Sequence, residues 1–393
     1  MIFTQGKVDV EPHEVGYDEG RLDVLNRHFQ SIIDDGLIQC AMYCFTRHGK
    51  VFAHGAVGKR SFRAEDTTPA QPDDVRWLAS MTKVITATAI MKLVEDGLVR
   101  LNSPVRDFLP QFDTPPYNAI NLLHLLTHTS GLHADSGVYE NKYQHGYWSL
   151  MDNALKNHKK EDGDFDWLTA ALGVIGSGVR TRPNEEWSYS SFGYMVLGEV
   201  ISKVTGQFAH DYIMQNIIEP LGMNDTCFKL TPELARRSII CNKYVEKDVS
   251  DVINGTVEPS TREIHKMPGT SGAMIGTAYD MTLFGNLFLG RSNSRILGRK
   301  GIEAMLKQRV NLPNKCWGAN ANRSYCAGFD MRLDEPFLFS ESTVTHEGAG
   351  ASALHVDPQE DMVAAWFVPF TENADWVVQA LFNTINVIWS GLK

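Results

Sequence analysis

The chain has 393 residues, of which 43% are hydrophobic and 21% are charged. These fractions are close to the averages of soluble globular proteins, so they exclude disordered and fibrous classes, and the length exceeds that of one small domain. The formal net charge of −10 has the wrong sign for a chain whose main partner is a phosphate backbone or an anionic membrane surface. We therefore expect neither nucleic acid nor a membrane among its partners.

The sequence predicts a cytoplasmic protein without a cofactor or a metal. No stretch approaches the ~18 apolar residues of a membrane span, and the first residues lack the basic and apolar regions of a secretory signal. The six cysteines are too dilute for a disulfide scaffold, and no C-x-x-C pair indicates zinc. We expect them to be free thiols in a reducing compartment.

The chain opens with a predicted helix that is followed by a hairpin. Apolar residues recur at three- and four-residue steps over residues 17–33, as on one face of an amphipathic helix. Two apolar runs, 38–46 and 51–58, are joined by a short turn that contains Gly49. This arrangement is typical of two antiparallel strands.

The middle of the chain is predicted to be mainly helical. Residues 80–95 have helical spacing with few polar side chains and end before Gly97, a residue type that favours helix C-termini. Further helical candidates are separated by clusters of Gly, Pro and Asn. These candidates are residues 121–126, 167–174, 191–204 and 209–218. We expect residues 156–166 and the loop 246–263 to be mobile insertions.

After residue 266 the predicted helices and strands alternate. Because an isolated two-stranded hairpin is only marginally stable, we expect the N- and C-terminal strands to share one sheet. Helices are expected at residues 278–289, 301–308 and 376–389, and strands at residues 325–333, 352–356 and 362–368.

The expected fold class is mixed α/β (α+β), an antiparallel sheet flanked by helices with an all-α region inserted. Residues 1–75 and 260–393 would form the α/β domain, and residues 76–259 the mainly helical domain. The active site would lie in the cleft between them.

A Ser-x-x-Lys motif, Ser80 and Lys83, begins the long apolar helix. Positions i and i+3 lie on one helical face, so the lysine can reach the serine. A serine hydroxyl is a weak nucleophile until a base takes its proton, and a desolvated lysine can be neutral enough to do so. The alternative is a surface serine and lysine at a helix start. A second match, Ser390 and Lys393, shows that the spacing alone proves little.

Two further motifs contain side chains that can transfer protons. Tyr189-x-Ser191 lies just before a predicted helix, where a tyrosine beside a lysine could act as a general base. The alternative is a core tyrosine satisfied by one hydrogen bond. In His346-x-Gly348, near the C-terminal strands, the histidine can donate or accept a proton near pH 7, and the glycine lets the backbone approach a ligand.

Two other patterns indicate no site. His124 and His128 have the i, i+4 spacing of zinc proteases, but the glutamate that should follow the first histidine is missing. The Gly-rich residues 269–272 are not a phosphate loop, because no Gly-Lys-Ser/Thr follows them.

Three motifs, taken in chain order, resemble those of the serine β-lactamase and penicillin-binding-protein superfamily, in its class C and D-alanyl-D-alanine-carboxypeptidase branch. The chain also resembles the family VIII carboxylesterases and the fungal acyltransferases of that fold. The similarity extends to residues 125–132, 183–194 and 272–284, and it spans most of the chain. The three motifs are Ser80-x-x-Lys83, Tyr189-x-Ser191 and His346-x-Gly348.

This resemblance implies a β-lactamase-like fold with a nucleophile at Ser80, and with Lys83 and Tyr189 as the base pair. It also implies an oxyanion hole made by the backbone N–H groups of Ser80 and Ala349, the residue after Gly348. No cofactor is implied.

Two residues depart from the family pattern. Ser191, which is expected to contact the substrate, stands where asparagine is frequent, and His346 stands where β-lactamases usually have lysine. A histidine is mostly neutral at pH 7, so it attracts a substrate carboxylate less than a fixed ammonium group would.

The expected function is acyl transfer through an acyl-enzyme on Ser80, with water as the usual acceptor. The expected partner is a small-molecule ester or amide, with an ester preferred and with weak or no β-lactamase activity. The alternatives on the same site are a β-lactamase, a D-amino-acid amidase or peptidase, and an acyltransferase that uses an alcohol. An alternative of a different class is a non-catalytic penicillin-binding or sensor module.

Overall fold

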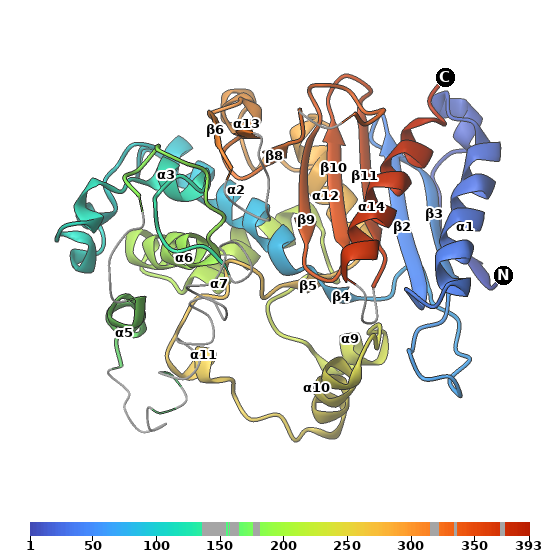
Figure 1. Ribbon diagram of the computed structural model, residues 1–393, viewed down its shortest axis with the longest axis horizontal. Coiled ribbons are helices and arrows are strands. Elements are labelled where there is room, and N and C mark those ends of the chain that lie inside the picture. Colours follow the sequence, from blue (N-terminus) through green and yellow to red (C-terminus); the bar gives the residue numbers. More distant parts are fainter. Residues whose placement is uncertain are drawn as a thin grey trace.

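The computed structural model describes residues 1–135, 155, 157, 165–175, 181–314, 322–333, 336–369 and 374–393. Within them, nine strands form an antiparallel sheet with the order β1-β3-β2-β11-β10-β9-β8-β7-β6 (Figure 1). These strands are β1 (Phe3–Gln5), β2 (Cys40–Arg47), β3 (Lys50–Gly58), β6 (Val310–Pro313), β7 (Asn322–Tyr325), β8 (Asp330–Met331), β9 (Val344–Gly348), β10 (Ser352–Asp357) and β11 (Met362–Phe367).

The sheet joins the two ends of the chain. Strand β2 pairs with β3 on one side and with β11 on the other, so that Met42 lies opposite Phe367. The prediction that the N- and C-terminal strands share one sheet is therefore confirmed, and the expected mixed α/β fold class with it.

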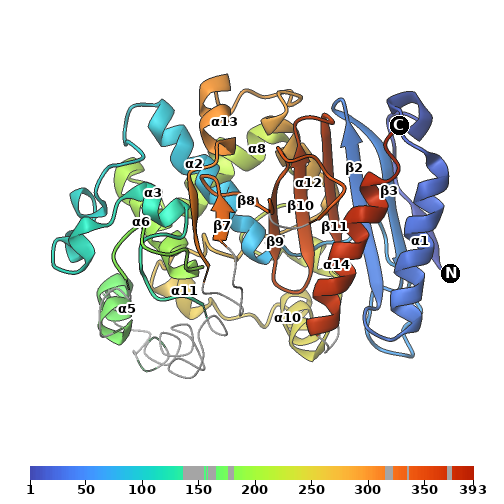
Figure 2. The same cartoon turned by 45° about the horizontal axis from the view of Figure 1, so that its top comes forward.

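Helices cover both faces of the sheet (Figures 1 and 2). On β2, Met42 belongs to a core that includes α12 (Ala278–Phe288), whereas Tyr43 belongs to a second core with α1 (Glu19–Asp34) and α14 (Ala374–Trp389). Successive strand residues point to opposite faces, so a central strand that is covered on both sides is apolar throughout.

The predicted helices of the middle segment form a bundle beside the sheet, on the left of Figure 1. Nearly every side chain of α2 (Thr82–Glu95) is buried, and this helix packs against α6 (Ser191–Thr205). The predicted helices at residues 121–126, 167–174 and 209–218 are present as well. They are α3 (Leu122–Leu126), α5 (Trp167–Ile175) and α7 (Ala209–Ile213), which continues as a π-helical turn, η6 (Met214–Ile218), and α8 (Glu219–Leu221).

The remaining elements lie outside the nine-stranded sheet. Strands β4 (Arg76–Trp77) and β5 (Ile275–Gly276) form a separate two-stranded ribbon. The other helices are α9 (Pro232–Arg236), α10 (Lys243–Asn254), α11 (Thr261–Ile264) and α13 (Arg299–Leu306). The 3-10 turns are η1 (Pro12–Val15), η2 (Ala79–Met81), η3 (Val105–Asp107), η4 (Pro110–Phe112) and η5 (Tyr117–Ala119).

Two secondary-structure predictions are wrong. The expected loop 246–263 contains most of α10, whose first turn is capped by the Asn242 side chain and whose Val249 is buried. The expected strand 325–333 is divided into β7 and β8 by a turn in which Cys326 N donates to Phe329 O and Gly328 has a φ of 101°. The other expected insertion, 156–166, lies mostly outside the described residues.

Among the described residues, no helix combines the length and the apolar character that crossing a membrane requires. The division of the chain at residues 75/76 and 259/260 stays a prediction.

Candidate active site

Ser80 lies on η2, a single turn between β4 and the buried helix α2. The residue before it, Ala79, has a φ of 48°, a left-handed conformation that is costly for a residue with a Cβ atom. The segment of Gly272 lies beside this turn, where a Cβ atom on Gly272 would be at an ordinary contact distance of 3.5 Å from the backbone carbon of Ala79. Ser80 is thus half-buried in a turn whose preceding residue has a strained backbone.

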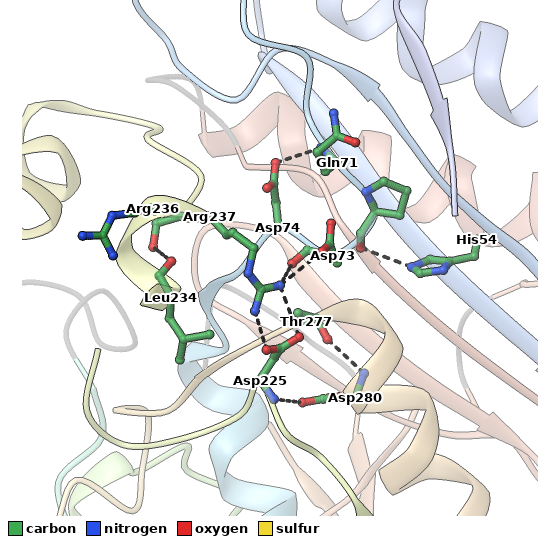
Figure 3. Close-up of polar contacts among 12 residues, drawn as sticks. His54, Gln71, Asp73, Asp74, Asp225, Leu234, Arg236, Arg237, Thr277 and Asp280 are labelled. Atoms are coloured by element: carbon green, nitrogen blue, oxygen red, sulfur yellow. Dashed lines mark hydrogen bonds and ion pairs between the residues drawn. The ribbon is translucent and has the colours of Figure 1, made fainter. Parts of the chain in front are cut away.

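The ribbon that leads into Ser80 is anchored by a polar network (Figure 3). The backbone N–H of Val75 donates to the carbonyl oxygen of Arg237, whose guanidinium group is paired with Asp225. Asp280, at the start of α12, accepts hydrogen bonds from the Asp225 amide at 2.9 Å and from the Thr226 hydroxyl at 2.8 Å. This network connects α12 to the residues directly before β4.

Lys83 is fully buried one helical turn after Ser80. Its Nζ atom lies 3.0 Å from Ser80 Oγ, 3.0 Å from Ser191 Oγ and 2.7 Å from the carbonyl oxygen of Ser271. Burial lowers the pKa of Lys83 to about 8, and the charge of Asp135 opposes this shift. A lysine with this pKa is partly neutral near pH 8, so it is able to accept the Ser80 proton.

Tyr189 lies two residues before α6, and its side chain is hydrogen bonded to that of Ser80. The Nζ atom of Lys83 is 4.8 Å from the centroid of the Tyr189 ring. Burial, and after it the charge of Asp135, raises the pKa of Tyr189 well above 10. Tyr189 is therefore a neutral phenol before any reaction, and Lys83 is the stronger candidate for the base.

Ser191 and Asp135 form a hydrogen-bonded pair beside Lys83. The Ser191 amide donates to Asp135 Oδ1 at 2.7 Å, and the Ser191 hydroxyl donates to Asp135 Oδ2 at 2.5 Å. Burial raises the pKa of Asp135, whereas the Lys83 charge and the two hydrogen bonds lower it. Asp135 is not among the predicted site residues, because it lies outside the three motifs. Its place three residues after the family-like segment 125–132 was the available signal.

His128, which the sequence analysis left without a role, holds the backbone around Tyr189. Its carbonyl oxygen accepts from Ser188 N at 2.8 Å, and its Nδ1 atom accepts from Ser190 N at 3.1 Å. The imidazole ring lies 4.4 Å from the Tyr189 ring, centroid to centroid. Burial lowers the pKa of His128 well below 6.5, so the ring is neutral. Its place in the segment 125–132 was again the only signal.

His346 lies on β9, with its ring centroid 6.4 Å from that of Tyr189. Its Nδ1 atom is 2.8 Å from the carbonyl oxygen of Glu347, which can only accept, so Nδ1 carries the proton and Nε2 presents a lone pair. Burial, and after it the Lys83 charge, lowers the pKa of His346 to about 4. This burial favours a neutral ring near pH 7, which the sequence pattern does not reveal, and a catalytic role of His346 stays a prediction.

Strand β9 ends at Gly348, against the segment that carries Ser80. A Cβ atom on Gly348 would collide with the carbonyl oxygen of Leu78 and with the hydroxyl of Ser352, so only glycine fits there. Ala349 follows at an exposed position. The end of β9 is thus beside Leu78, two residues before Ser80, while the role of Ala349 in an oxyanion hole stays a prediction.

His124 and His128, with their zinc-like spacing, both bond to the backbone. Nδ1 of His124 accepts from the Asn121 amide at 3.2 Å and completes the cap of α3, and its Nε2 is 2.9 Å from the Asn184 side chain. Within the described residues, no group of three or more His, Cys, Asp and Glu side chains is arranged to hold a metal ion.

Comparison with known proteins gives a family match and a curated relative. A family model described as Beta-lactamase matches residues 25–381. Lovastatin esterase of Penicillium rubens is 30% identical over 220 residues, which cover 51% of this chain and 51% of the esterase. The chain thus spans about half the length of this curated relative.

Two solved structures share the fold. A penicillin-binding protein homologue from Caulobacter crescentus has a TM-score of 0.71 at 18% identity, covering 96% of this chain and 99% of that chain. Simvastatin synthase from Aspergillus terreus has a TM-score of 0.70 at 18% identity, covering 94% and 98%. At these identities the likeness concerns the fold alone.

Proposed function

The chain belongs to the Beta-lactamase family, and from this premise we propose that it is a serine hydrolase that forms an acyl-enzyme on Ser80 and acts on small-molecule esters. The family match confirms the resemblance seen in the motifs and the β-lactamase-like fold. The observation that carries the proposed function is the 3.0 Å contact between Ser80 Oγ and Nζ of the buried Lys83.

Acylation begins at this contact. Neutral Lys83 takes the hydroxyl proton of Ser80, and Ser80 Oγ forms a bond to the acyl carbon of the ester. Negative charge moves onto the carbonyl oxygen of the substrate. The backbone N–H groups of Ser80 and Ala349 would form the oxyanion hole. Each would donate a hydrogen bond to this oxygen and stabilise its charge.

Tyr189 supplies the proton that the leaving group needs. Its phenol is protonated and hydrogen bonded to Ser80, so it can donate to the departing alkoxide, while the proton on Lys83 replaces the one that Tyr189 gives up. Lys83 is then neutral again. In deacylation a water molecule gives a proton to Lys83 while the water oxygen attacks the acyl carbon. The bond between Ser80 Oγ and the acyl carbon then breaks, Lys83 returns the proton to Ser80 Oγ, and the carboxylic acid leaves.

A preference for neutral esters is supported by the charge state of His346. With a pKa of about 4 this ring is uncharged near neutral pH, so it offers no fixed positive charge to the carboxylate of a β-lactam or a D-alanyl peptide. The name of the relative, lovastatin esterase, is consistent with an ester as substrate.

A comparison of three chromogenic substrates tests this function. We expect turnover of p-nitrophenyl acetate and butyrate, which is lost in Ser80→Ala, and much slower turnover of a chromogenic cephalosporin. A kcat/KM that is higher for the cephalosporin than for both esters would make the protein a β-lactamase. Stoichiometric release of p-nitrophenol without further turnover would indicate a binding or sensor module, and ester formation with an added alcohol in place of hydrolysis would indicate an acyltransferase.

A further inference from the structure

The three partners of Lys83 use all the hydrogens of its ammonium form. The carbonyl oxygen of Ser271 can only accept a hydrogen bond, whereas the hydroxyl groups of Ser80 and Ser191 are each able to donate or accept. With contacts of 2.7, 3.0 and 3.0 Å, a protonated Lys83 donates one hydrogen to each of them. On deprotonation the amine keeps two hydrogens and gains a lone pair, so one of these three bonds must reverse or break.

The hydrogen bonds to Asp135 fix the direction of the Ser191 hydroxyl beside Lys83. The Ser191 amide gives its hydrogen to Oδ1 and the Ser191 hydroxyl gives its hydrogen to Oδ2. When Asp135 is ionised, its carboxylate accepts both bonds and cannot donate. The hydroxyl contact of 2.5 Å is in the range of a short, charge-assisted bond. With its hydrogen committed to Asp135, the Ser191 oxygen can only accept from Lys83.

The lone pair of neutral Lys83 then has one direction left. Ser271 and Ser191 both require a hydrogen from Lys83, which uses the two N–H bonds of the amine, and of the three partners only the Ser80 hydroxyl can donate to the lone pair. We propose that Asp135 is a positioning residue that fixes the direction of the Ser191 hydroxyl and thereby turns the lone pair of Lys83 toward Ser80. The inference rests on the proposed role of Ser80 as the nucleophile.

Asp135 also acts on Lys83 through its charge. Burial lowers the pKa of Lys83 to about 8, and the Asp135 carboxylate holds it above the value that burial alone would give. Loss of this carboxylate should therefore make Lys83 deprotonate at a lower pH. The other titratable groups around Lys83 have pKa values shifted toward their neutral forms by burial, so they carry no charge near pH 8. They are Tyr189, Tyr194, His128 and His346.

The rate at which a fluorophosphonate labels Ser80, measured against pH on the whole protein, separates these two effects. In the wild type the second-order rate constant should rise with pH through an apparent pKa near 8. Asp135→Asn removes the charge and cannot accept both bonds from Ser191. Its labelling rate at high pH should fall about tenfold or more. The limb of the profile, which is the part where the rate rises with pH, should move to lower pH because the apparent pKa of Lys83 falls.

Three further variants complete the test. Ser191→Ala keeps the charge of Asp135 but loses the oxygen that accepts from Lys83, so its rate should fall while its limb moves less than that of Asp135→Asn. Asp135→Glu retains the charge and should keep the limb near that of the wild type. Asp113→Asn, the matched control, removes one carboxylate whose side chain is 69% exposed, and should leave both rate and limb unchanged.

The outcomes distinguish this inference from the proposed function. If Asp135→Asn folds and labels at the wild-type rate with an unmoved limb, Asp135 positions nothing, although a labelled Ser80 would still support the serine hydrolase. If Asp135→Asn does not fold, a wild-type rate in Ser191→Ala overturns the inference, and a reduced rate with an unmoved limb supports it. A wild type that is not labelled at Ser80 contradicts the proposed function itself.

Discussion

The imidazole ring of His128 lies 4.4 Å from the phenol ring of Tyr189, and the backbone amides on both sides of Tyr189 donate to His128. The histidine therefore contacts the side chain of Tyr189 and also fixes the path of the chain around it. Its own φ of 57° is a backbone conformation that Asn tolerates better than most residues with a side chain.

Two substitutions at this position should differ in effect. His128→Asn keeps a side-chain acceptor within the left-handed backbone, whereas His128→Phe keeps a ring but leaves the buried Ser190 amide without its acceptor. An unsatisfied buried donor costs about 1–3 kcal/mol. We predict a lower free energy of unfolding and lower ester turnover in His128→Phe than in His128→Asn, measured by urea denaturation and by p-nitrophenyl acetate hydrolysis. Equal stability of the two variants would show that the Ser190 bond contributes little.

Lys83 and Tyr189 should behave as one unit in kinetics. If the proton of Ser80 passes through Lys83 and returns to the leaving group through Tyr189, removing either residue interrupts the same path. We predict that Lys83→Ala, Tyr189→Phe and the double variant lose similar amounts of kcat, since effects of residues that act together do not add. A double variant whose loss is the product of the two single losses would mean that the residues act independently.

His346 should give no titration between about pH 5 and 8. Its pKa of about 4 leaves the ring neutral over this interval, so the pH profiles of ester kcat/KM in the wild type and in His346→Ala should have the same shape there. His346→Lys should raise the ratio of cephalosporin to neutral ester turnover, because an ammonium group attracts the substrate carboxylate. A wild-type limb near pH 6.5 that disappears in His346→Ala would show that the ring titrates in the ordinary range for histidine.

Asp280, in the network of Figure 3, should make stability depend on pH. Burial raises its pKa from 3.8 to about 7, although the hydrogen bonds that it accepts from Thr226 and Asp225 act to lower the pKa. Between about pH 4 and 7 the folded protein keeps a proton that the unfolded chain has released, so the contribution of Asp280 to the free energy of unfolding falls as the pH rises through this interval.

Removal of this carboxyl group should reverse the trend. We predict that the Tm of Asp280→Asn, relative to that of the wild type, increases from pH 5 to pH 8 in scanning calorimetry. Asp113→Asn, in which the lost carboxylate is exposed, serves as the control and should show no such increase. A Tm difference for Asp280→Asn that is the same at both pH values would mean that Asp280 is already ionised at pH 5 in the folded protein.

The parts of the structure that depend on neighbours in sequence could be predicted from the sequence. The Ser80 and Lys83 pair needs only the geometry of one helical turn, and the apolar runs of β2, β3, β10 and β11 are continuous enough to indicate buried strands. The helix α10 was missed although Val245 and Val249 are four residues apart, because its many charged residues resemble those of a loop.

The rest of the site depends on contacts between distant segments. Asp135 meets Ser191 across 56 positions of sequence and His128 meets Ser190 across 62, and nothing in the spacing of these residues indicates such contacts. The neutral state of His346 has the same origin, because its burial is a property of the folded chain. The motifs therefore predict which groups react, whereas the residues that contact these groups, such as Asp135 and His128, became visible only in three dimensions.

The role of Ser80 as the nucleophile is tested most directly by the site and extent of covalent labelling by a fluorophosphonate, determined by intact mass and peptide mapping in the wild type and in Ser80→Ala. We predict one adduct per chain in the wild type, located on Ser80, and no adduct in the variant. An adduct of the same mass and extent on Ser80→Ala, or an adduct on another residue of the wild type, would contradict the assignment of Ser80 as the nucleophile.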